Sequence, residues 1–316
     1  MENRINALDY VRVVAITMIL MCHYFLFSEL NNGISRYFAG TGNMLFFLVS
    51  AVLFGYKYRI EKQDFRGIAF IKKRTMRLGA SVWPFLLISV VLYLVFKIPF
   101  SWVNVGLNFL FLGYFGRLPG NGHLWFLTVL MACYLELVLL MKLKEKEQWV
   151  SWIILVLSVI AMTIGERLGV PSGAFFNMGL FGFVFLNNDL FLRKSRSMKW
   201  WMAVAIVIIN TVTFFLEFEG LFAVSRSIHF ILTGLCGLTL LALMMRFLPN
   251  KSSKVVSFFC GISFEIYLVH HTLCAGPFVR ITYWPYSHLL NFAIMVLLTI
   301  VLAVILKLLS SAHSFD

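Results

Sequence analysis

The 316-residue chain is predicted to form an all-α, polytopic transmembrane helix bundle with about ten spans and both termini in the cytoplasm. Sixty per cent of its residues are hydrophobic and only 13% are charged, whereas soluble domains average about 25% charged residues. A bilayer accepts this much apolar surface when the backbone groups bond one another within helices. The residue-by-residue alternation that is typical of a transmembrane barrel is absent, which leaves helices as the expected spanning element.

Ten apolar runs are long enough to cross a membrane as helices. They lie near 9–29, 37–56, 78–96, 123–142, 150–166, 174–190, 200–217, 226–247, 257–274 and 288–307. The first run is about 20 residues long and has no small-residue cleavage site, so we expect it to remain as a span. We see no internal repeat or soluble domain, and expect one membrane-embedded domain over residues 1–316.

The segment 98–122 contains an eleventh apolar run of only 14 residues, too short for an ordinary span. If it does not cross, 20 Lys and Arg residues face the cytoplasm and six face outside, with Arg12 counted on neither side. If it crosses, the two counts become 13 and 13. Because cytoplasmic loops carry an excess of Lys and Arg, we expect 98–122 to be an outside or re-entrant segment. Residues 57–77 are then a cytoplasmic basic segment, with an amphipathic helix from Asp64.

The formal net charge of +13 follows from this cytoplasmic bias and favours contact with anionic lipid. The basic residues lie between apolar spans, so nucleic-acid binding is not expected. All five cysteines lie within apolar runs without a Cys-x-x-Cys pair, which indicates buried, inert thiols. We expect no metal site.

The first span carries three ionisable side chains, Asp9, Arg12 and His23, although one charge at mid-membrane costs about 2.5–3.5 kcal/mol. Arg12 and His23 are 11 residues apart, which places them on one helix face, about 16 Å apart along the axis. Asp9 lies one turn before Arg12, where the two charges offset each other. Two simpler interpretations stay open: Arg12 snorkels to the interface, and His23 is a structural hydrogen-bonding residue.

Two further histidine sites are expected at the depth of His23. His123 opens the fourth span from the outside, and His270 and His271 lie near the outer end of the ninth span. Three spans thus bring imidazoles to the outer half, which indicates a polar cavity that opens outward. Near neutral pH, histidine is the side chain best suited to proton transfer.

A basic group formed by Lys73, Arg74 and Arg77 lies on the cytoplasmic side. Arg74 and Arg77 are about one helical turn apart. One interpretation is ordinary contact with anionic lipid headgroups. The other is a phosphate site, since arginine offers a planar fork of donors.

In this order, these motifs resemble acyltransferase family 3, whose members are integral membrane acyltransferases that modify extracytoplasmic glycans. The segments that carry the resemblance are Leu8-Asp-Tyr-Val-Arg12 followed by His23, Phe46-Phe-Leu-Val-Ser50, Lys73-Arg-Thr-Met-Arg77, His123-Leu-Trp125 and Tyr267-Leu-Val-His270. They extend over nearly the whole chain.

The resemblance implies transfer of an acyl group, expected to be acetyl, from cytoplasmic acyl-CoA to a hydroxyl of an extracytoplasmic polysaccharide or lipid-linked glycan. It implies that His23 is the general base and that Arg12 orients the donor or holds the helix face with Asp9. It further implies that the CoA phosphates are held by Lys73, Arg74 and Arg77, and that the acceptor side is shaped by His123, Trp125, Tyr267 and His270. Ser50 is expected to be an acyl relay or a packing residue.

These expectations place the protein in a bacterial-type cytoplasmic membrane, with envelope polysaccharide machinery as a candidate partner. Two other classes of function stay open. One is a transporter or flippase for a lipid-linked glycan, which would also carry ionisable residues inside its bundle. It is disfavoured because no inverted repeat or pair of broken helices stands out in the sequence. The other is a non-catalytic subunit of a polysaccharide export complex.

Overall fold

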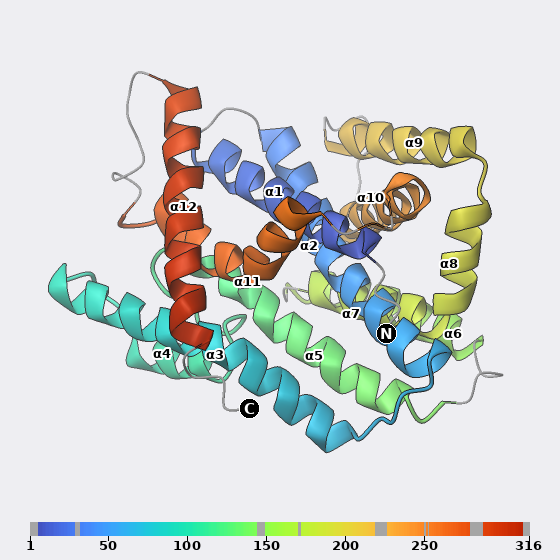
Figure 1. The fold of residues 1–316 in the computed structure, drawn as a ribbon, viewed down its shortest axis with the longest axis horizontal. Coiled ribbons are helices and arrows are strands. Elements are labelled where there is room, and N and C mark those ends of the chain that lie inside the picture. Colours follow the sequence, from blue (N-terminus) through green and yellow to red (C-terminus); the bar gives the residue numbers. More distant parts are fainter. Residues whose placement is uncertain are drawn as a thin grey trace. The chain divides into compact units, whose positions relative to one another are not determined.

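The computed structural model describes residues 6–28, 32–143, 149–169, 172–218, 226–249, 251, 253–278 and 287–311. Within these ranges every regular element is a helix, which confirms the predicted all-α class (Figure 1). The α-helices are α1 (Ala7–Phe27), α2 (Asn32–Gly55), α3 (Gly67–Val95), α4 (Trp102–Phe109), α5 (Trp125–Leu140), α6 (Trp149–Arg167), α7 (Gly173–Leu186), α8 (Asn188–Ser197), α9 (Trp200–Phe218), α10 (Arg226–Phe247), α11 (Lys254–Cys274) and α12 (His288–Ser311). A π-helical turn, η1 (Tyr56–Ile60), follows α2, and a 3₁₀ turn, η2 (Gly122–Leu124), precedes α5.

Nine of the ten predicted apolar runs each fall on one of these helices, and the run 174–190 extends over α7 and the start of α8. Eight described helices are long and apolar enough to cross a bilayer, and α7 with α8 adds a ninth if the bent pair is one span. The one run not yet accounted for, 200–217, corresponds to α9. The apolar part of α9, Trp200–Leu216, is slightly shorter than the eight helices that are long enough to span. The chain is therefore a multi-pass helical membrane protein.

The sequence predicted one span near 174–190, and the structure shows a break within it, between α7 and α8. The two helices meet at an angle of 80°. Asn187 donates to Ser151 Oγ at 2.7 Å and to the Phe183 carbonyl at 2.9 Å. Asn188 donates to the Val52 carbonyl at 3.0 Å. These amide side chains bind neighbouring helices and so hold the chain at the point where it turns.

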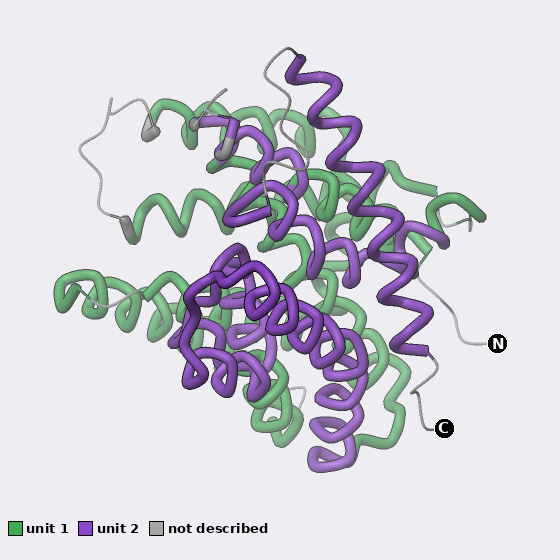
Figure 2. Tube along the Cα trace, turned by 90° about the vertical axis from the view of Figure 1, so that its left-hand side faces the viewer, with its two compact units in different colours: residues 1–18, 36–65, 132–257 green, residues 19–35, 66–131, 258–316 purple. Residues whose placement is uncertain are grey.

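The chain divides into two compact units, which Figure 2 colours separately. Unit 1 comprises residues 1–18, 36–65 and 132–257, and unit 2 comprises residues 19–35, 66–131 and 258–316. In unit 1, α10 packs against α6, α7, α8 and α9, and α6 packs along α7. In unit 2, α3 packs against α12 and α4.

Helix α3 is the longest helix of unit 2, with 29 residues. Its length of about 43 Å exceeds the roughly 30 Å of a bilayer's hydrocarbon core. The surplus lies at the basic N-terminal end, because the apolar run predicted from the sequence covers only 78–96. The structure begins this helix at Gly67, whereas the sequence predicted a helical start at Asp64.

The segment 98–122 contains α4, which has only 8 residues, and a loop that leads to η2. A helix of this size is about 12 Å long, well short of the hydrocarbon core. The placement of the segment outside the membrane, or as a re-entrant loop, stays a prediction. Labelling of a cysteine at Arg117 by an impermeant thiol reagent in intact cells would test it.

Candidate active site

Four histidines of unit 2 lie together, and His23 near the end of α1 is one of them. Its Nδ1 atom lies 3.0 Å from the Ile19 carbonyl oxygen and 3.1 Å from Nε2 of His270 in α11. The centroids of the two rings are 4.9 Å apart. The structure thus brings together two residues that are 247 positions apart in the sequence.

Hydrogen bonds of the His270 ring define which nitrogen atoms carry protons in this pair. His270 Nδ1 lies 2.8 Å from the Tyr267 carbonyl oxygen and 3.2 Å from the Ile266 carbonyl oxygen. Carbonyl oxygens only accept, so His270 Nδ1 carries the hydrogen, and in the neutral ring Nε2 is an acceptor. His23 Nδ1 must then donate to it. This assignment follows from the hydrogen-bond network and leaves the lone pair of neutral His23 on Nε2.

The other two imidazoles, His123 and His271, form a stacked pair. Their ring centroids are 4.7 Å apart and their planes differ by 18°. His271 Nδ1 donates to the Gly120 carbonyl at 2.7 Å, and His123 Nε2 donates to the Leu268 carbonyl at 3.1 Å. By the same reasoning, the lone pairs of the neutral rings lie on His271 Nε2 and His123 Nδ1. His123 Nδ1 is buried and has no hydrogen-bond partner.

The four histidines differ in how exposed they are. His270 and His123 are 0% and 4% exposed, whereas His23 and His271 are partly exposed. The rings of His23 and His271 meet edge to face, with centroids 4.7 Å apart. His23 and His271 are therefore the two imidazoles of the cluster with exposed surface, and His270 and His123 are buried beside them. Despite the four imidazoles, the residues that the structure describes contain no group of three or more His, Cys, Asp or Glu side chains suited to a metal ion.

The loop before His123 is held by polar side chains from α3 and α11. Asn121 donates to the Tyr93 hydroxyl at 2.8 Å and to Ser89 Oγ at 3.3 Å. Thr272 of α11 donates to Asn121 Oδ1 at 2.9 Å. Tyr267, predicted as an acceptor-side residue, donates its hydroxyl hydrogen to the His123 carbonyl. These bonds fix the backbone on which His123 sits.

Two glycines allow this loop to touch the end of α11. Gly120 and Gly276 have φ values of +68° and +88°, in the left-handed region that favours glycine. A Cβ on Gly276 would lie 2.6 Å from the Gly120 Cα atom. The turn-rich sequence from Leu118 to Gly122 thus makes a close backbone contact that positions Gly120 as the acceptor for His271.

The basic group of α3 also belongs to unit 2. Lys73 and Arg77 are exposed, and Arg74 is partly buried. The Arg74 guanidinium carbon lies 5.3 Å from the centroid of the Phe70 ring, which is a cation–π distance. An exposed Lys and Arg beside a stacked Arg form a surface that suits a multiply charged anion.

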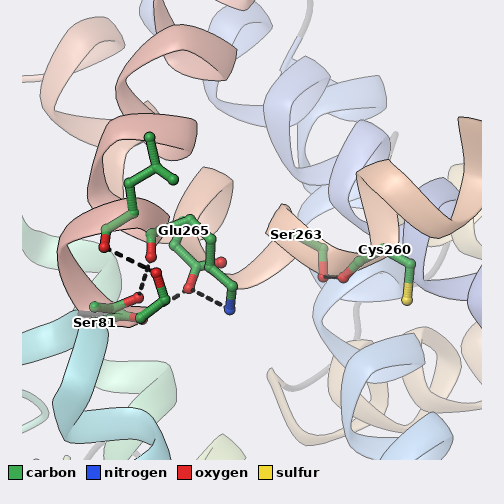
Figure 3. Close-up of polar contacts among 8 residues, drawn as sticks. Ser81, Cys260, Ser263 and Glu265 are labelled. Atoms are coloured by element: carbon green, nitrogen blue, oxygen red, sulfur yellow. Dashed lines mark hydrogen bonds and ion pairs between the residues drawn. The ribbon is translucent and has the colours of Figure 1, made fainter. Parts of the chain in front are cut away.

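A buried carboxylate that the sequence analysis missed lies on α11. Glu265 is 1% exposed, and its Oε1 atom accepts from Ser81 Oγ at 2.8 Å and from Lys307 Nζ at 3.2 Å. Figure 3 shows Ser81 and Glu265 close together, and two of its dashed lines mark the bonds to this carboxylate. Glu265 Oε2 is buried and has no hydrogen-bond partner. The network joins α3, α11 and α12, and an acidic residue inside an apolar run was the signal that could have identified it.

The remaining predicted site residues are Asp9, Arg12, Ser50 and Trp125. Asp9, Arg12 and Ser50 belong to unit 1, where Asp9 is buried and the other two are partly buried. Trp125 is the first residue of α5 in unit 2 and is partly buried, with its ring 6.3 Å from that of Phe126. Their roles in binding or catalysis stay predictions.

The comparisons with known proteins gave one match. A family model described as an acyltransferase domain, that of acyltransferase family 3, matches residues 5–308. Neither the search of curated proteins nor the search of solved structures found a match.

Proposed function

The chain belongs to acyltransferase family 3, and from this premise we propose that it moves an acetyl group from cytoplasmic acetyl-CoA to a hydroxyl of an extracytoplasmic glycan. The observation that carries the proposal is the state of His23. Its hydrogen bonds place the lone pair on Nε2, and the ring is partly exposed. A neutral imidazole with one unprotonated ring nitrogen can accept the proton that a hydroxyl must lose.

In the proposed reaction, His23 Nε2 takes the proton of the acceptor hydroxyl while its oxygen attacks the thioester carbonyl carbon. The tetrahedral adduct then collapses, the carbon–sulfur bond breaks, and CoA leaves as a thiolate. The His23 imidazolium returns its proton to that sulfur. The products are an O-acetyl ester and free CoA, and His23 is neutral again, so protons and bonds balance.

We assign the CoA phosphates to Lys73, Arg74 and Arg77 at the end of α3. Arginine binds phosphate with two parallel donors, which a lysine ammonium cannot reproduce. We assign the acceptor side to the histidine cluster, with His123 and Tyr267 fixing the wall of the site. The acceptor class, a polysaccharide or lipid-linked glycan of a bacterial-type envelope, rests on the family's known substrates.

Transfer of label from donor to glycan tests this proposal directly. Membranes containing the wild-type protein receive CoA that is labelled in its acetyl group, and the polysaccharide and lipid-linked fractions are then isolated. We expect label in an ester that mild alkali releases, and no transfer from CoA labelled in its adenine.

Two variants complete the test. His23→Gln should transfer no label, while His229→Gln, which alters an imidazole of unit 1, should behave as wild type. Failure of the wild-type protein to label any carbohydrate or lipid fraction would overturn the acyltransferase assignment and favour the transporter interpretation.

A further inference from the structure

We infer that His270 is a positioning residue that holds the His23 imidazole in the one tautomer able to act as a base. The inference rests on the proposed function, because it assigns a role to a residue behind the proposed base. The sequence placed His270 on the acceptor side, whereas its Nε2 atom lies 3.1 Å from His23 Nδ1 and its side chain is fully buried.

The hydrogen-bond chain has one direction. The Tyr267 and Ile266 carbonyls fix the hydrogen of His270 on Nδ1. Nε2 of the neutral ring is then an acceptor, and it draws the hydrogen of His23 to Nδ1. The Ile19 carbonyl, 3.0 Å away, favours the same tautomer. Because His270 Nε2 and the Ile19 carbonyl both accept from His23 Nδ1, the hydrogen stays on Nδ1 and His23 Nε2 is unprotonated. The same two contacts orient the His23 ring.

The bond between the imidazoles becomes stronger during the reaction. When His23 accepts the substrate proton, its Nδ1–H is part of a cation, and hydrogen bonds from charged donors are about twice as strong as neutral ones. The site excludes water from His270, which is 0% exposed, so no solvent molecule competes for this bond. His270 thereby stabilises the charged form of His23 more than the neutral form. This is the role of the third group in a nucleophile–base–orienter arrangement.

Two substitutions separate this role from a structural one. His270→Gln can keep an acceptor oxygen near the position of Nε2, and thus an acceptor for His23. His270→Asn can keep a donor near the position of Nδ1, and thus the bonds within α11, but it does not reach His23. If His270 positions the base, Asn should lower kcat by about 10- to 100-fold with little change in KM for acetyl-CoA. Gln should recover much of that loss.

A structural role predicts the opposite order, with Asn equal to or better than Gln, and losses that follow the melting temperature. Equal kcat in wild type and His270→Asn would overturn the inference. That result is distinguishable from failure of the proposed function, because His23→Gln would still abolish transfer of label if His23 is the base.

The tautomer itself is observable without turnover. In full-length protein labelled with ¹⁵N-histidine and reconstituted in lipid nanodiscs, nitrogen shifts distinguish protonated from unprotonated ring atoms. The signals of His23 are assigned by their loss in His23→Gln. We expect a protonated Nδ1 and an unprotonated Nε2 in the wild type at neutral pH, and a mixture of tautomers in His270→Asn. An unprotonated Nδ1 in the wild type would overturn the inference even if every variant failed to fold.

Discussion

Among the residues that the structure describes, units 1 and 2 both bury amides, hydroxyls and a carboxylate, but only unit 2 buries imidazoles. Among described residues of unit 1, the buried polar side chains are mainly amides and hydroxyls, such as Asn187 and Asn188, whose donors bind a serine and backbone carbonyls. Unit 1 also buries the carboxylate of Asp9, and unit 2 buries the carboxylate of Glu265 together with the imidazoles of His123 and His270. Amides and hydroxyls join helices without exchanging protons, whereas imidazoles and carboxylates exchange them. We therefore assign a structural role to the buried amides and hydroxyls, and we look for proton transfer among the imidazoles and carboxylates.

The largest expected effect comes from removing the proposed base in unit 2. His23→Gln should lower acetyl transfer by about 10²- to 10⁴-fold, the usual cost of losing a general base. His23→Ala should be equally inactive, with acetyl-CoA binding nearly unchanged in both variants. Rates and melting temperatures should be measured together, because a merely structural histidine predicts that Gln is tolerated and Ala is destabilising. An active His23→Gln variant would contradict the assignment, and partly exposed His271 would be the next candidate.

A smaller effect is expected at the basic end of α3. Replacing Arg74 and Arg77 together with Gln should weaken binding of CoA by about 10- to 100-fold, as expected when charge-assisted hydrogen bonds are lost at a partly solvated site. Lys at both positions should restore only part of the affinity. The matched control is Arg193→Gln, an exposed arginine of α8 in unit 1. Unchanged CoA affinity in the double Gln variant would return these arginines to simple lipid contact.

The buried carboxylate should affect stability rather than turnover. Lys307→Leu leaves Glu265 with Ser81 as its remaining partner on Oε1, which should destabilise the fold by about 1–3 kcal/mol. Replacing Glu265 and Lys307 together with Leu should recover part of that loss, because no charge is then left unpaired. Thermal melting of purified protein in detergent would measure both effects. A double variant that melts lower than Lys307→Leu would assign Glu265 a role beyond pairing.

The smallest effect is expected at the glycine contact beside the histidines. Gly276→Ala should destabilise the protein by about 1–2 kcal/mol, since a left-handed conformation costs that much for residues with a Cβ. It should also lower activity, because the Gly120 carbonyl that holds His271 would move. Gly122→Ala is the control: its Cβ would meet no atom within 4 Å. Equal melting temperatures for the two variants would show that the contact is not strained.

The spans could be predicted from the sequence because hydropathy and helix length are local properties. The bend at Asn187 could not, since it depends on partners in other helices, Ser151 and the Val52 carbonyl. The positions of His23, His123 and His270 within their predicted spans indicated that they lie at a similar depth in the membrane. The structure places their rings together. The hydrogen bond between His23 and His270 depends on how α1 and α11 are each rotated about their own axes. Hydropathy and helix length contain no information on that rotation.

Two other features of the site lay beyond sequence reasoning for similar reasons. The sequence analysis placed His270 and His271 at one depth, but neighbouring positions on a helix point about 100° apart, so it could not show that both rings enter one cluster. Its contact with the Gly120 carbonyl depends on the close approach of two glycine turns. The pairing of Glu265 with Lys307 joins residues 42 positions apart on different helices, and hydropathy contains no information on such pairs.

Helix α3 connects the basic group to the loop before His123 within one continuous helix. Arg77 lies 12 residues before Ser89, which accepts from Asn121 in the loop that precedes His123. Twelve residues of helix make a spacing of about 18 Å along the axis. In the proposed reaction, the donor places a charged group at the basic end and a reactive carbonyl at the histidine end, so this spacing would select donors by their length. We therefore expect acetyl phosphate and short thioesters, which lack an arm of that length, to be poor donors even at high concentration.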